Sequence, residues 1–80
     1  MYWLNDKTRR YYHAIIERDL LGDLVVTRTT GGCGTNQGRI MTYPVNGLIE
    51  ANKMLDDVSK DRERHGYRLV DSVSYHHNPL

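Results

Sequence analysis

The sequence contains only one cysteine, Cys33, among its 80 residues. A single thiol excludes an internal disulfide and favours a reducing compartment, for which we predict the cytoplasm. The sequence also has no apolar run near the roughly 18 residues that a membrane-spanning helix needs, so no membrane partner is predicted. The opening residues, MYWLNDKTRR, lack the apolar core of a signal peptide, so we expect no secretory leader.

The sequence also lacks an excess of one charge, because 11 Lys and Arg residues nearly balance 10 Asp and Glu residues, for a net charge of +1. A broad basic field is therefore absent, and any contact with nucleic acid would depend on local clusters of arginine. The length fits one domain over residues 1–80, and the apolar content is that of an ordinary small globular protein.

Residue spacings that indicate catalysis or metal binding are missing as well. Cys33 and the four histidines form no C-x₂-C or H-x₃-H pair, and no base is indicated for the thiol. The glycine-rich stretch is followed by no Gly-Lys-Ser/Thr and opens no helix, which excludes a Walker A loop and a Rossmann fingerprint. The carboxylates Asp56 and Asp57 are expected on a solvated helix face. We predict a protein that is not an enzyme, with no metal and no cofactor; these absences argue against the alternative of a small hydrolase.

A glycine-rich stretch stands at the centre of the chain, where residues 27–39 read TRTTGGCGTNQGR and hold four of the seven glycines. Strand-like sequences precede and follow it, at residues 24–27 and 39–43. Such clusters mark turns that need positive φ or close approach of the backbone to another group. Two interpretations are open: a tight hairpin with bulges, or backbone N–H groups that meet a phosphate or a partner chain.

Alternating apolar residues predict antiparallel strands on either side of this stretch. In residues 9–18, Tyr12, Ala14 and Ile16 share a face that should be buried, whereas the opposite face, with Tyr11 and His13, is mixed. A turn at residues 19–23, with Gly22 in the left-handed region, should lead into a strand over residues 24–30. The strand at residues 39–43 should end at Pro44, and the short connections predict a meander.

The N-terminal residues Tyr2, Trp3 and Leu4 suggest a segment docked on the domain as an edge strand. We favour Trp3 as a core residue over an exposed stacking residue, because buried aromatic side chains contribute much of the burial energy of a small domain.

A helix is predicted over residues 46–65, with Asn46 as the N-cap and Gly66 as the glycine just beyond the C-terminus. The basic run at residues 60–65 is expected to be a solvated helix end, and the pairs Lys53–Asp57 and Asp56–Lys60 should lie on the wet side. A further strand is predicted over residues 67–75, followed by a polar tail at 76–80. The residues at helical spacing on the predicted inner face are Leu48, Ala51, Leu55, Val58 and Arg62, and Ile49 and Met54 widen its apolar side.

These elements predict an α+β fold, an antiparallel sheet of four or five strands with one helix packed across a face. Their order, together with three short motifs, resembles the WGR domain over residues 8–70. The family is named for a Trp-Gly-Arg triplet and occurs in poly(ADP-ribose) polymerases and in small free-standing bacterial proteins. The motifs are Leu21-Gly22-Asp23, Gly31-x-x-Gly34-Thr35 and Arg62-Glu63-Arg64-His65-Gly66-Tyr67.

The signature triplet of the family falls at residues 30–32, where Thr30 replaces the tryptophan and Gly32 replaces the arginine. A Gly-Gln pair of the family appears reversed, as Gln37-Gly38. In the polymerases the tryptophan packs on the DNA backbone near a 5′ end, and the arginine helps to bridge domains. Without these side chains, a phosphate contact would depend on the loop backbone and on nearby arginines.

The resemblance implies a small non-catalytic WGR-like binding module with weak, sequence-independent binding of nucleic acid. The alternative is a protein-interaction module or homodimer that uses an exposed sheet edge or the face bearing Tyr11 and His13. The candidate nucleic-acid-binding residues are Arg9, Arg10, Arg28, Thr30, Gly31, Gly32 and Arg39.

Overall fold

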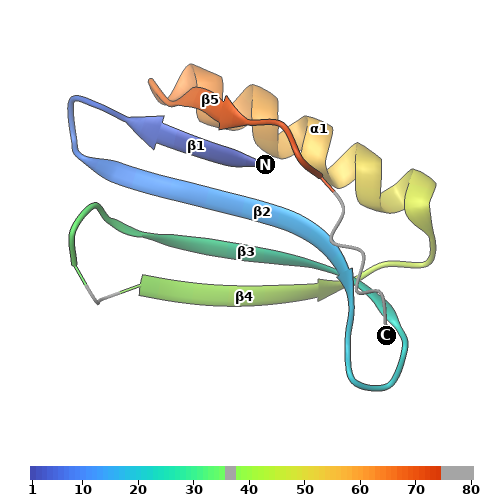
Figure 1. Cartoon of the computed structure of the whole chain (residues 1–80). Coiled ribbons are helices and arrows are strands. Elements are labelled where there is room, and N and C mark those ends of the chain that lie inside the picture. Colours follow the sequence, from blue (N-terminus) through green and yellow to red (C-terminus); the bar gives the residue numbers. More distant parts are fainter. Residues whose placement is uncertain (36–37, 75–80) are drawn as a thin grey trace.

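The computed structural model describes residues 1–35 and 38–74 and shows the predicted α+β fold. Five antiparallel strands form one sheet in the order β4-β3-β2-β1-β5, and one helix lies along one face of it (Figure 1). The predicted tail at residues 76–80 and Tyr75 lie outside the described residues, and the last strand is shorter than the predicted 67–75, because residues 72–74 are not in a strand. The elements are β1 (Tyr2–Asn5), β2 (Arg10–Arg18), β3 (Leu24–Gly32), β4 (Gly38–Pro44), α1 (Leu48–Arg64) and β5 (Arg68–Asp71).

Strands β2, β3 and β4 form the predicted meander. Between β2 and β3, the side chain of Asp19 accepts hydrogen bonds from the N–H groups of Leu21 and Asp23, at 3.0 and 2.9 Å. Gly22 has φ of +84°, which confirms the predicted left-handed position. β3 is longer than predicted, because Gly31 and Gly32 continue its pairing with β2. These glycines are therefore part of the sheet, and the connection to β4 begins only at Cys33.

The prediction of an edge strand at the N-terminus is wrong, because β1 lies inside the sheet with β2 on one side and β5 on the other. The chain returns from the helix as β5 and pairs along β1, which local sequence does not reveal. The prediction for Trp3 is confirmed: its side chain is fully buried and meets the Tyr12 ring edge-on, with centroids 5.8 Å apart.

The core lies between the sheet and α1. The alternation predicted for β2 is confirmed, since Tyr12, Ala14 and Ile16 all face the helix and are buried. Because α1 covers this face, its own side chains at helical spacing complete the core. The remaining buried members of the core are Leu24 and Val26 from β3 and Ala51, Leu55 and Val58 from α1.

The predicted start of the helix needs two corrections. Gly47, not Asn46, occupies the N-cap position, and it has no side chain to bond the first turn; instead the Asn46 N–H donates to the Glu50 carboxylate at 3.3 Å. Neither Leu48 nor Ile49 belongs to the buried face of the helix, because 52% and 89% of them are exposed. At 100° per residue, Ile49 projects nearly opposite to buried Ala51. The predicted ion pairs do form on the exposed side of the helix, Lys53–Asp57 at 3.7 Å and Asp56–Lys60 at 3.6 Å.

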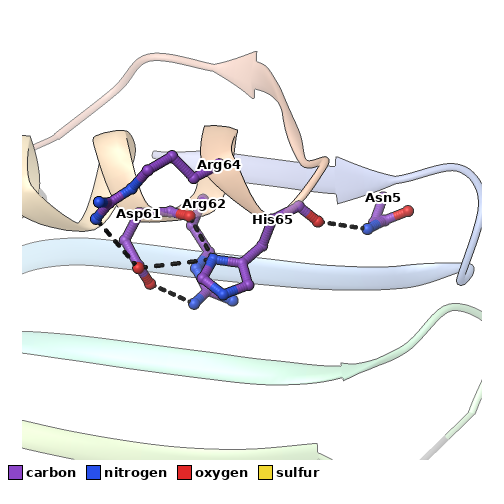
Figure 2. Close-up of polar contacts among 5 residues, drawn as sticks. All are labelled: Asn5, Asp61, Arg62, Arg64 and His65. Atoms are coloured by element: carbon purple, nitrogen blue, oxygen red, sulfur yellow. Dashed lines mark hydrogen bonds and ion pairs between the residues drawn. The ribbon is translucent and has the colours of Figure 1, made fainter.

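The C-terminus of α1 is closed as predicted by Gly66, which has φ of +84°. Gly66 N–H donates to Glu63 O at 3.1 Å and Tyr67 N–H donates to Arg62 O at 3.0 Å, which is the Schellman pattern. The amide of buried Asn5 adds a further contact, because its Nδ2 donates to His65 O at 3.1 Å (Figure 2). This junction fixes the direction in which the chain enters β5.

Within the described residues, no helix is both long and apolar enough to cross a lipid bilayer.

We expect Gly66→Val to lower the free energy of unfolding by about 1 kcal/mol or more, because a β-branched residue is strained at positive φ. A Cβ at this position would lie 3.4 Å from Asn5 Nδ2, so strain of the backbone and not a clash should dominate. Gly66→Asn is the matched control, since asparagine tolerates the left-handed region, and it should lose less stability. Equal melting temperatures for the two variants and the parent would contradict the assignment.

Candidate functional site

The helix leaves part of the sheet uncovered. α1 packs against β2, β3 and β5, whereas every residue of β4 is exposed except half-buried Tyr43. Figure 1 shows the β3–β4 ribbon extending beyond the helix. Side chains on the helix side of this ribbon are therefore open to a ligand, and the candidate site lies at the end of the ribbon where β3 passes into β4.

An open notch of about 490 Å³ lies at this end, and we call it the arginine notch. The register explains its composition, because Arg10 lies opposite Gly32 and Thr30 lies opposite Arg39 on neighbouring strands. The two arginines therefore flank a position without a side chain. No large apolar side chain lines the notch, which argues against an apolar ligand. The lining residues are Arg10, Thr30, Gly31, Gly32, Thr35, Gly38 and Arg39.

Gly32 and Thr35 shape the notch through the turn that follows β3. The Thr35 hydroxyl donates to Gly32 O at 3.0 Å, and the Thr35 N–H donates to the same oxygen at 3.3 Å. Gly34 stands between them with φ of +78°, a conformation that favours glycine. A Cβ added at Gly32 would meet the Thr35 side chain at 3.5 Å, an ordinary contact. The glycine at position 32 thus leaves space that a side chain is able to fill.

The charge of the arginine notch is not neutralised from within the described part of the chain. No ion pair to Arg10 or Arg39 occurs among residues 1–35 and 38–74, whereas Arg62 and Arg68 each contact an aspartate at 2.6 Å. The exposed arginines of the notch therefore present two uncompensated positive charges around a small polar surface. Such an arrangement suits an anion with several oxygen acceptors, because guanidinium groups bind phosphate and carboxylate through paired N–H groups.

Arg62, unlike Arg10 and Arg39, has its charge paired and its guanidinium packed against aromatic rings, although it also lies on the helix side of the sheet. Its guanidinium lies over the Tyr12 ring at 4.6 Å and over the Tyr67 ring at 5.1 Å. Asp61 holds it at 2.6 Å and also contacts Arg64 and His65, as Figure 2 shows. Part of the basic run at residues 60–65 is thus a structural contact with the sheet, and not only the solvated helix end that the sequence suggested.

Five of the seven candidate residues line the arginine notch, and Arg9 and Arg28 do not. Arg9 has a left-handed backbone with φ of +56°, and its carbonyl accepts a hydrogen bond from Cys33 N–H at 2.8 Å. Arg28 is half-buried, with its guanidinium 4.4 Å from the centre of the Tyr43 ring. Their positions make Arg9 part of a turn and Arg28 part of the packing between β3 and β4.

Sequence reasoning did not place Thr35 or Gly38 among the candidate residues. Thr35 belongs to the motif Gly31-x-x-Gly34-Thr35, which draws attention to this position. The motif does not reveal that the Thr35 hydroxyl contacts the Gly32 carbonyl. Gly38 lies opposite Gly31, which only the strand register reveals. Gln37, the other member of the reversed pair, lies outside the described residues.

The opposite face of the sheet carries the aromatic residues that the sequence placed there. Tyr2 and Tyr11 stack with ring centroids 5.9 Å apart, and His13 lies 6.1 Å from the Tyr2 ring. Burial lowers the pKa of His13, which favours its neutral form. In the described ranges, no group of three or more His, Cys, Asp or Glu side chains is placed to hold a metal ion.

No family model, curated protein or solved structure matches this chain. The fold and the site are therefore defined by their own geometry, as a small α+β domain with an arginine-lined notch at one end of its sheet.

The ion pairs Asp61–Arg62 and Asp6–Arg68 can be tested separately, because each aspartate pairs with a different arginine. The hydrogen bond from Arg62 lowers the pKa of Asp61, and the hydrogen bond from Arg68 lowers the pKa of Asp6, both below the ordinary 3.8. The stability that each ion pair adds to the folded state is fully present when the pH is above the ordinary aspartate pKa. It is lost as the pH falls through the lowered pKa of the folded state. We expect Arg62→Gln to raise the pKa of Asp61 alone and Arg68→Gln to raise that of Asp6 alone, as measured by carboxyl carbon NMR titration. An unchanged Asp61 pKa in Arg62→Gln would contradict the contact.

Proposed function

We propose that this chain is a small non-catalytic WGR-like binding module that binds the phosphate backbone of nucleic acid weakly and without sequence preference. The observation that supports this most is the placement of Arg10 and Arg39 on either side of Gly32, with no ion pair to either from the described residues. Two positive side chains around a floor of glycine and threonine suit one or two phosphates.

The position of the site supports the resemblance that the sequence suggested. Thr30 and Gly32, which stand where the WGR family has tryptophan and arginine, both line the arginine notch. The residues most changed from the family thus lie at the proposed contact. Because an aromatic ring and a guanidinium are both missing there, binding is expected to lack a stacking contact and one charge.

The residues that line the arginine notch are also the reason to expect binding without sequence preference. Arginines that contact phosphates fix a duplex in place but do not read its bases. β4 begins beside the notch and presents no recognition helix to a groove, because α1 packs over β2, β3 and β5 and leaves β4 uncovered. We therefore expect affinity in the non-specific range, with Kd of roughly 10⁻⁴ to 10⁻⁶ M.

The test is a fluorescence titration of a DNA duplex with a 5′-phosphate, repeated at several salt concentrations. With about two to four phosphate contacts, log K should fall with log salt at a slope of about −2 to −4. Arg10→Ala and Arg39→Ala should each flatten the slope by about one. Lys53→Ala is the matched control, because Lys53 is an exposed cation on the outer surface of α1. Arg28→Ala should have a smaller effect than the notch variants, since its guanidinium is stacked on Tyr43.

Absence of binding at low salt and high protein concentration would contradict the proposal. Binding that Lys53→Ala weakens as much as Arg10→Ala would contradict the assignment of the site.

A gain of function gives an independent test at the same position. Gly32→Arg restores the arginine of the family triplet, and the backbone there is free of positive φ with only an ordinary contact to Thr35. The added charge should steepen the salt slope by about one and strengthen binding at low salt. Val70→Arg adds the same charge at the opposite sheet edge, on exposed β5, and should strengthen binding less. Equal gains from the two variants would show that only the overall charge matters.

A further inference from the structure

The two edges of the sheet differ in how they are protected. β5, at one edge, has only four residues, a register irregularity against β1, and an Asp6–Arg68 ion pair beside it. β4, at the other edge, has seven residues, and Arg39 is its only charged one. Short strands, bulges and charges are the features that prevent edge strands from pairing with other chains. β4 has few of them and is the edge open to pairing.

The hydrogen-bonding pattern shows which groups β4 offers. Val45 N–H donates to Leu24 O at 3.1 Å, which fixes the alternation of the β3–β4 ladder. By that alternation Met41 exchanges its hydrogen bonds with Arg28, its partner on β3. Ile40 and Thr42 then direct their N–H and C=O groups away from β3. No described strand pairs with that side of β4, so these groups face solvent.

We propose that two copies of this chain associate through their β4 strands, antiparallel and related by a twofold axis at Met41. In this register Ile40 of each copy lies opposite Thr42 of the other, and both are residues whose backbone groups point outward. Each such pair exchanges two hydrogen bonds, and the two sheets join into one continuous sheet.

The side chains agree with this register. Arg39 of one copy lies opposite Tyr43 of the other on the helix side, where a guanidinium and an aromatic ring attract each other. Met41 meets its own copy at the axis, and its flexible thioether adapts to such a contact. Pro44, which has no N–H to donate, lies opposite Gly38, whose N–H donates to the proline carbonyl. No like charges stand opposite each other, which satisfies the requirement for cross-strand pairing.

Other registers fit less well. If the register shifts by one residue, a residue whose N–H and C=O point toward the second copy lies opposite one whose N–H and C=O point back toward its own β3. The hydrogen bonds between the two β4 strands are then lost. A twofold axis at Ile40 keeps the bonding pattern but places Arg39 opposite Met41 and shortens the paired length. An axis at Thr42 places Pro44 opposite Ile40 and limits the pairing within β4 to residues 40–44. The register centred on Met41 therefore makes the fullest use of β4.

Sedimentation velocity over a range of protein concentrations tests the association. The parent chain should move from monomer to dimer as concentration rises. Ile40→Lys introduces the charge that protected edges carry and should raise the dimer dissociation constant by about tenfold or more. Val70→Lys places the same charge on exposed β5 and should leave the dissociation constant unchanged. A parent that stays monomeric up to millimolar concentration, or a dimer that Ile40→Lys leaves intact, would overturn the proposal.

Disulfide trapping tests the register without depending on the stability of the Lys variant. In a Cys33→Ser background, Met41→Cys should form a crosslinked dimer under mild oxidation, because opposed residues at a non-hydrogen-bonded position have Cα atoms about 4.5 Å apart. Ile40→Cys and Tyr43→Cys should crosslink far less, since each faces a different residue of the second copy. Efficient crosslinking at residue 40 or 43 in place of 41 would refute the register. Repeating both experiments without nucleic acid separates this proposal from phosphate binding.

Discussion

Burial of apolar side chains between α1 and the sheet holds the helix in place, and Arg62 adds a contact at the helix end by lying over the Tyr12 and Tyr67 rings. The guanidinium lies over both rings, and Tyr12 in turn meets the fully buried Trp3 edge-on. The contact therefore connects α1, β2 and the chain entering β5. Asp61 balances the charge of Arg62 at 2.6 Å, so a cation is placed against the core without remaining unpaired.

The packing of α1 also determines which part of the sheet stays open. The end of α1 is fixed above β2, and Gly66 turns the chain back so that β5 pairs with β1. The helix is thereby placed toward one side of the sheet, and β4 receives no cover. The same placement that completes the core leaves both an arginine-lined notch and an unpaired edge on the far side. Phosphate binding and β4 pairing both involve this uncovered ribbon, and a sheet extended through β4 would hold two notches on one face.

Glycine has two different uses in the central stretch. Gly31 and Gly32 are extended strand residues, and the missing side chain of Gly32 leaves an open floor between Arg10 and Arg39. Gly34 is a turn residue with positive φ. The sequence predicts one loop whose glycine N–H groups face outward, but the N–H of Gly31 belongs to the ladder with Tyr11 on β2. The surface offered at the notch is therefore made mainly by side chains, and much less by a backbone cradle.

The sequence by itself determined the elements governed by neighbouring residues. The alternation of Tyr12, Ala14 and Ile16, the left-handed glycines at 22 and 66, and the helix all depend on contacts within a few residues. Four of the five candidate residues in the notch, Thr30, Gly31, Gly32 and Arg39, lie together because they belong to the β3–β4 hairpin, whereas Arg10 comes from β2. Only the tertiary structure decided that β1 is an interior strand and that the Arg62 guanidinium lies over the Tyr12 and Tyr67 rings. Those outcomes depend on which strand the chain meets after the helix, and pairings between distant residues leave no periodic pattern in a single sequence.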